Sequence, residues 1–129
     1  MFIHHVYFWL KNPGTKDDQA RFIEGLKKLS KANTIKKFYI GIPAATNRDV
    51  TERSYSVSWL LFFDDPSAQD SYQTDPIHLK FVEECSSLWN KVDVYDSIGV
   101  GSLVVILYGY IFLGCESRLR GVSHILCYH

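Results

Sequence analysis

The first strand-like segment of the chain, residues 2–10, is apolar on both of its faces, and this limits where it can lie in a fold. Successive side chains of a strand point to opposite sides of its sheet. One side carries the even positions, which are Phe2, His4, Val6, Phe8 and Leu10. The other side carries Ile3, His5, Tyr7 and Trp9. A strand that is apolar on both sides is typically covered on both sides, so residues 2–10 are predicted to form a strand with both faces covered.

The segments that follow predict a helix and three more strands. Residues 15–32 have one apolar stripe at helical spacing. Residues 35–42, 55–63 and 92–98 are rich in β-branched and aromatic side chains, and turn residues such as Pro43 separate them, so each is expected to form a strand.

Two Asp-Pro pairs lie between the last two of these strands. Asp65-Pro66 and Asp75-Pro76 each place a capping carboxylate before a proline at the first helical position, so each is expected to begin a helix. The resulting order, β-α-β-β-α-β, is typical of an α+β ferredoxin-like sandwich. Such a fold has a four-stranded antiparallel sheet with its helices on one face.

A sheet with helices on one face leaves its other face bare. We expect the even face of residues 2–10 to be the bare one, with His4 on it, and His5 to point towards the helices. A bare apolar face is typical of an interaction surface. The simplest partner is a second copy of the chain, so a homodimer through the sheet face is predicted.

Composition divides the chain into a domain of residues 1–98 and an extension of residues 99–129. The first part holds all nine lysines and all but one of the acidic residues, whereas the second holds five of the eight glycines and no lysine. The apolar run of residues 100–113 is too short to predict a transmembrane helix. The extension could be an edge strand, a membrane-seeking segment or a non-native, disordered addition. No membrane association is expected for residues 1–98.

Charge and cysteine content narrow the function classes. Lys+Arg and Asp+Glu number 14 each, which predicts no nucleic-acid binding. The three cysteines have no metal-ligand spacing, and neither a metal nor a cofactor is expected. His4 and His5 point to opposite faces and cannot share a metal. The residues at the start lack the basic region of a secretory signal, so a cytoplasmic location is expected.

Several segments in this order resemble the stress-responsive α/β-barrel (Dabb) family over residues 1–98. They are residues 5–11, 41–45, 55–63, 72–78 and 94–96. The resemblance implies a homodimer in which two sheets pack face to face and close an α+β barrel, and a role in stress. One plant member of the family is a polyketide cyclase that performs an aldol condensation without metal or cofactor.

The resemblance to the cyclase implies a site of His5, Tyr72 and His78. A histidine suits a base near neutral pH, and a tyrosine hydroxyl can hold a developing enolate. A further histidine of the cyclase falls on Val57, and small aliphatic pocket residues fall on Trp9 and Trp59, so the same substrate is not implied. All three residues could equally be structural, since a covered histidine often bonds a backbone carbonyl.

A set of aromatic residues could stack on a small apolar ligand in a cleft between sheet and helices, or could simply be core. These residues are Tyr7, Trp9, Trp59, Phe81 and Trp89. Three hypotheses therefore stand: a dimeric, ligand-binding stress protein; a cofactor-free lyase or cyclase; and a purely structural homodimer. An enzyme requires the two histidines and the tyrosine to converge on one site.

Overall fold

The computed structural model describes residues 1–100, 103–107 and 110–113, and the chain divides into two compact units, Met1–Ser97 and Ile98–His129. In the second unit, β5 (Leu103–Leu107) pairs antiparallel with β6 (Tyr110–Leu113). One of the alternatives for residues 99–129 is a non-native or disordered extension. Most of these residues, 101–102, 108–109 and 114–129, lie outside the described residues, so this alternative stays a prediction. No helix in the described ranges is long and apolar enough to cross a membrane.

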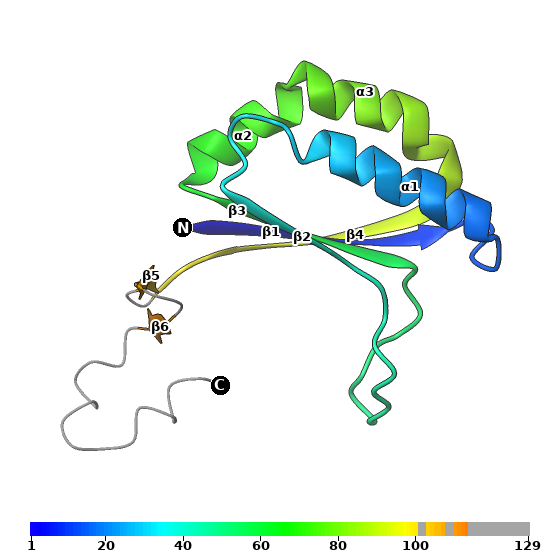
Figure 1. Ribbon diagram of the computed structural model, residues 1–129, viewed down its shortest axis with the longest axis horizontal. Coiled ribbons are helices and arrows are strands. Elements are labelled where there is room, and N and C mark those ends of the chain that lie inside the picture. Colours follow the sequence, from blue (N-terminus) through cyan, green and yellow to red (C-terminus); the bar gives the residue numbers. More distant parts are fainter. Residues whose placement is uncertain (101–102, 108–109, 114–129) are drawn as a thin grey trace. The chain divides into compact units, whose positions relative to one another are not determined.

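The first unit is a four-stranded antiparallel sheet with helices over one face (Figure 1). Its strands lie in the order β2-β3-β1-β4. They are β1 (Phe2–Leu10), β2 (Lys37–Gly41), β3 (Val57–Phe63) and β4 (Trp89–Ile98). The helices are α1 (Lys16–Leu29), α2 (Pro66–Thr74), α3 (Pro76–Cys85) and the short 3-10 turn η1 (Ser86–Leu88). The ferredoxin-like prediction is confirmed, and β1 lies between β3 and β4.

The assignment of the two faces of β1 was wrong. Its even positions are the buried ones, and the Phe8 ring lies 4.7 Å from Phe22 of α1 and 6.3 Å from Phe81 of α3, between ring centroids. The even face therefore packs against the helices, and the odd face is the open one. The physical reason is that the apolar stripes of the helices bury the most hydrocarbon-like face, whereas the odd face carries amphipathic rings that tolerate partial exposure.

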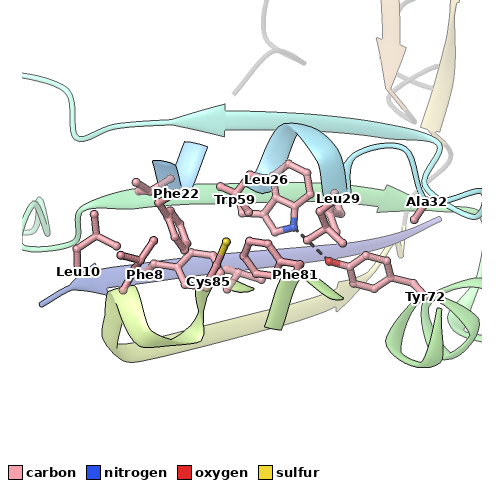
Figure 2. Packing of buried hydrophobic residues seen from close by; sticks show 14 of the residues in the cluster. Phe8, Leu10, Phe22, Leu26, Leu29, Ala32, Trp59, Tyr72, Phe81 and Cys85 are labelled. Atoms are coloured by element: carbon pink, nitrogen blue, oxygen red, sulfur yellow. Dashed lines mark hydrogen bonds between the residues drawn. The ribbon is translucent and has the colours of Figure 1, made fainter. Parts of the chain in front are cut away.

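The register of strand pairing shows that β3 and β2 also have one face towards the helices and one open face. Val6 lies opposite Trp59 and His5 lies opposite Leu60, which in turn lies opposite Tyr39 of β2. The odd positions of β3 are buried with the even positions of β1, and they form the floor of the core that the helices cover (Figure 2). In this core the indole Nε1–H of Trp59 donates to the hydroxyl of Tyr72 at 3.3 Å.

Both Asp-Pro pairs begin helices, as expected. The carboxylate of Asp65 accepts from the backbone N–H of Ala68 at 2.8 Å, and that of Asp75 accepts from Ile77 at 2.8 Å. Each proline occupies the first turn, where its missing N–H costs nothing. The break between α2 and α3 brings Tyr72 and His78, on either side of it, above the start of β1.

Candidate functional site

Four polar side chains from four elements meet on the helix side of the sheet, and we call them the His4 cluster: His4 of β1, Tyr72 of α2, His78 of α3 and Asp96 of β4. His4 Nδ1 lies 2.5 Å from Asp96 Oδ1. The His4 ring lies 6.1 Å from the Tyr72 ring, which lies 4.7 Å from the His78 ring, between centroids. The cluster combines two imidazoles, a phenol and a carboxylate.

His5 does not belong to this cluster, contrary to the expectation that it faces the helices. It points to the open face, where its Nδ1 lies 3.3 Å from the hydroxyl of Tyr7. The strand-one histidine near Tyr72 and His78 is His4, which was expected on the dimer side. Of the predicted trio, the structure thus brings together Tyr72 and His78 and leaves His5 apart. Whether any of the three has a catalytic role stays a prediction.

Asp96 was missed by the sequence reasoning, although a signal for it existed. In a ferredoxin-like sheet the first and last strands are neighbours, and antiparallel pairing brings the end of the last beside the start of the first. The sequence could therefore have predicted that an acidic residue at the end of β4 lies next to a histidine at the start of β1. Its carboxylate is 44% exposed, whereas the His4 side chain is 7% exposed, so the pair reaches from the core to the surface.

Tyr72 is held as a neutral hydrogen-bond donor. The residue is 2% exposed. Burial raises the pKa of Tyr72 to about 12, against the opposing hydrogen bond from Trp59. At neutral pH the hydroxyl therefore keeps its proton. Because its oxygen already accepts from Trp59, the proton remains available for an acceptor in the cluster.

His78 offers a free ring nitrogen. Its Nδ1 atom is buried and has no hydrogen-bond partner among the described residues. Burial, and then the nearby His4 ring, lower the pKa of His78, whereas the nearby backbone of Gln73 and the charge of Asp75 raise it by less. The ring is therefore neutral at neutral pH, and a buried nitrogen without a partner is uncommon enough to call for a functional or solvent explanation.

Stability should decline in acid because burial lowers the pKa of both His5 and His78 below the value of 6.5 expected of an unfolded chain. In that range the unfolded chain binds protons that the folded chain does not, so the free energy of unfolding falls as pH falls. This stability is present above the unfolded pKa and is lost as pH drops through the lowered folded values. Urea denaturation between about pH 8 and about pH 5 measures the slope. His78→Gln should flatten it, and an unchanged slope in both His78→Gln and His5→Gln would contradict the assignment.

A second feature lies on the other side of the sheet, a cavity of about 500 Å³ that we call the open-face hollow. Its walls come from β1, β4 and the loop of residues 42–56, which extends from the sheet on the side away from the helices (Figure 1). The lining residues are His5, Tyr7, Trp9, Glu52, Tyr55, Lys91, Asp93 and Tyr95. The hollow is therefore mainly aromatic with a few charges.

The five aromatic residues predicted to bind a ligand are divided between these two places. Tyr7 and Trp9 line the open-face hollow. Trp59, Phe81 and Trp89 pack on the helix side, where the rings of Phe81 and Trp89 stack with centroids 5.8 Å apart. They therefore do not line one shared cleft, and their part in ligand binding stays a prediction. Within the described part of the chain, no group of three His, Cys, Asp or Glu side chains could hold a metal ion.

Comparison with known families decides the affiliation of the domain. The profile of the stress responsive A/B barrel domain, Dabb, matches residues 3–98, which is most of the chain. This chain belongs to the Dabb family. No curated protein matches its sequence.

Solved structures share the Dabb fold. A Dabb protein with a ferredoxin-like fold from Mesorhizobium loti is 24% identical, with a TM-score of 0.65 over 78% of this chain and 97% of that one. A dimeric ferredoxin-like protein of unknown function from Thermobifida fusca is 16% identical, with a TM-score of 0.60 over 74% and 88%. The hydroxynitrile lyase of Passiflora edulis is 17% identical, with a TM-score of 0.63 over 77% and 94%. At these identities the likeness shows the fold alone.

Proposed function

We propose that this Dabb domain binds a small, mostly apolar molecule that carries a hydroxyl or carbonyl oxygen, and that it does so at the His4 cluster. The observation that carries the proposal is the buried, unpartnered Nδ1 of His78, whose ring lies 4.7 Å from the ring of Tyr72 between centroids, together with the proton that the Tyr72 hydroxyl keeps. The nitrogen accepts a hydrogen bond and the hydroxyl donates one. A single hydroxyl group can satisfy both, by donating to the imidazole and accepting from the phenol, whereas a carbonyl oxygen satisfies only the phenol.

Energetics support an occupant at this place. A buried polar atom without a partner costs about 1–3 kcal/mol, and a ligand that supplies the missing hydrogen bond recovers part of that free energy. Aromatic rings pack beside these polar atoms, since the Tyr72 ring lies 5.3 Å from the Phe63 ring between centroids. His78 is only half-buried, so an arriving molecule meets it first at the junction of α2 and α3. The expected ligand is therefore apolar apart from one oxygen.

The domain is also proposed to be a homodimer through the open face of the sheet. On that face Tyr39 is 58% exposed and Tyr95 is 62% exposed, and the odd residues of β1 are only partly covered. The similar protein of Thermobifida fusca is dimeric. Exposed aromatic side chains gathered on one sheet face favour a self-complementary contact. Light scattering at micromolar concentration tests this, and a monomer would contradict it.

A second candidate function is proton transfer of the lyase type, which the His4–Asp96 pair favours. Asp96 engages Nδ1 of His4 and so fixes the ring, leaving its other nitrogen as a base, an arrangement known from carboxylate–histidine pairs in enzymes. In the cleavage of a cyanohydrin, such a base takes the hydroxyl proton as the C–CN bond breaks. The products are a carbonyl compound and cyanide, and the cyanide then takes up the proton. The similar hydroxynitrile lyase makes this reaction class the one to test first.

One set of variants tests both functions, first by ligand binding and then by turnover. Benzyl alcohol, as a probe, is titrated into the full chain, and the imidazole signals of His4, which lies 6.1 Å from Tyr72 between ring centroids, are followed by NMR. His78→Gln and Tyr72→Phe should each weaken binding about 2- to 10-fold, the worth of one hydrogen bond. His5→Gln is the matched control, because this histidine lies on the other face, and it should bind as the unaltered chain does.

The same variants, together with His4→Gln, are then assayed for release of benzaldehyde from mandelonitrile. Turnover that is lost in His4→Gln and kept in His5→Gln would establish the lyase function. Binding without turnover would leave the ligand-binding function alone. Equal binding by the His78→Gln and His5→Gln variants would contradict the proposed site.

A further inference from the structure

The open-face hollow has no part in the proposed function, and its walls have a chemistry of their own. We propose that it binds a small organic cation of the quaternary ammonium type. The proposal rests on three observations: aromatic walls, an excess of carboxylates, and an ammonium group that already lies on one of the rings.

The aromatic walls come first. The Tyr7 ring lies 4.4 Å from His5, 4.8 Å from Tyr55 and 5.9 Å from Tyr95, between centroids. Trp9 adds an indole to the same cavity. The face of an aromatic ring carries negative charge, so several rings around one cavity attract a cation and fit the methyl groups of a quaternary ammonium.

The charged residues that line the hollow have a net negative charge, which is the sign that attracts a cation. Glu52 and Asp93 contribute two carboxylates, against the single ammonium of Lys91. Hydrogen bonds from Ser54 lower the pKa of Glu52, which therefore stays ionised. Burial lowers the pKa of His5, so its ring adds no positive charge at neutral pH. The lining thus carries a net charge of −1, which opposes an anion and favours a cation.

Lys91 shows that the hollow accommodates a cation. Its Nζ lies 4.3 Å from the centroid of the Trp9 ring and 3.7 Å from Asp93 Oδ2. The side chain thus occupies the ring face and the carboxylate that a free cation would use. A ligand with its own ammonium group would compete with Lys91 for both.

The hollow lies on the face through which the homodimer is proposed to form, and Tyr95 belongs to both. Cation binding and association are therefore expected to influence each other. For that reason the oligomeric state of every variant is measured by light scattering alongside binding.

The test uses three probes of nearly equal shape and different charge. They are choline, the neutral 3,3-dimethyl-1-butanol and the anion 3,3-dimethylbutanoate, each followed through the indole N–H signal of Trp9. Choline should bind about 2- to 30-fold more tightly than the neutral alcohol, the range that cation–π contacts support. Equal affinity for the alcohol, tighter binding of the anion, or no binding of choline would overturn the proposal. None of these results would bear on the His4 cluster.

Variants then locate the site. Tyr95→Leu removes a ring of the hollow and should weaken choline binding, whereas Tyr39→Leu removes an equally exposed tyrosine of the same sheet face that does not line it. Lys91→Met vacates the Trp9 face and should tighten choline binding. Weaker binding by Lys91→Met, or equal losses in the two tyrosine variants at an unchanged oligomeric state, would refute the assignment.

Discussion

Replacement of Trp59 by alanine should lower the free energy of unfolding by about 3–5 kcal/mol, the usual cost of truncating a buried aromatic residue. Trp59 is 1% exposed and lies in the middle of the core between sheet and helices (Figure 2). Its ring contacts the Phe38 ring with centroids 5.7 Å apart, and its N–H satisfies Tyr72. The substitution therefore leaves a cavity and removes a buried hydrogen bond. Urea denaturation followed by circular dichroism measures the loss.

Trp9 provides the matched control, since it is the same side chain on the opposite face of the sheet. It is half-buried, and its N–H donates to the exposed Ser54 hydroxyl at 3.0 Å. Trp9→Ala should cost less than half as much as Trp59→Ala, measured at one low protein concentration where association contributes little. An equal or larger loss in Trp9→Ala would contradict the assignment of the even face of β1 to the core.

Gly25→Ala should destabilise the domain by about 1–3 kcal/mol, although alanine is the better helix former. Gly25 lies inside α1, where alanine would ordinarily stabilise by about 1 kcal/mol. Here a Cβ atom would lie 2.5 Å from the sulfur of Cys85 in α3. The sulfur is buried, so it cannot move aside freely. Overpacking therefore outweighs helix propensity, and the missing side chain of Gly25 lets the two helices approach.

The cause of that loss can be isolated in a second background. In a Cys85→Ala chain the sulfur is gone, so adding Gly25→Ala should be neutral or stabilising, a reversal of sign that a double-mutant cycle detects. Gly14→Ala is the control, because no atom lies within 4 Å of its added Cβ, and it should change stability by less than about 0.5 kcal/mol. The same loss in both backgrounds would show that contact with Cys85 is not the cause.

The topology was predictable because its signals are local. Both Asp-Pro pairs carry their own capping carboxylate and proline, and the helix starts therefore follow from adjacent residues. The apolar stripe of α1 repeats at helical spacing, and its buried members Phe22, Leu26 and Leu29 are those that such a stripe places on one side. Once the order of helices and strands is known, the rules of chain connection leave few possible topologies, and the ferredoxin-like one is among them.

The face assignment failed because alternation alone cannot orient a strand that is apolar on both sides. The distinguishing signal was the kind of apolar residue. Val6 and Leu10 are pure hydrocarbons, whereas Tyr7 and Trp9 carry polar groups that need a partner, and Trp9 finds one in Ser54 at the surface. The same mistake exchanged His4 for His5 in the site. Asp96 could be found only from the pairing of distant strands.

His4 and His5 are consecutive on one strand, so they lie on opposite faces of the sheet and in two chemically distinct surroundings. His4 lies in the His4 cluster on the helix side of the sheet, and His5 lines the open-face hollow on the opposite side. A shift of β1 by one residue against β3 would turn every side chain of the strand to the opposite face. One histidine would then take the other's place, and Ile3 or Val6 would fill the position that it left. The pairing of β1 with β3 thus decides which histidine lies at which of the two proposed sites, and a single residue inserted upstream in the strand would alter both sites together.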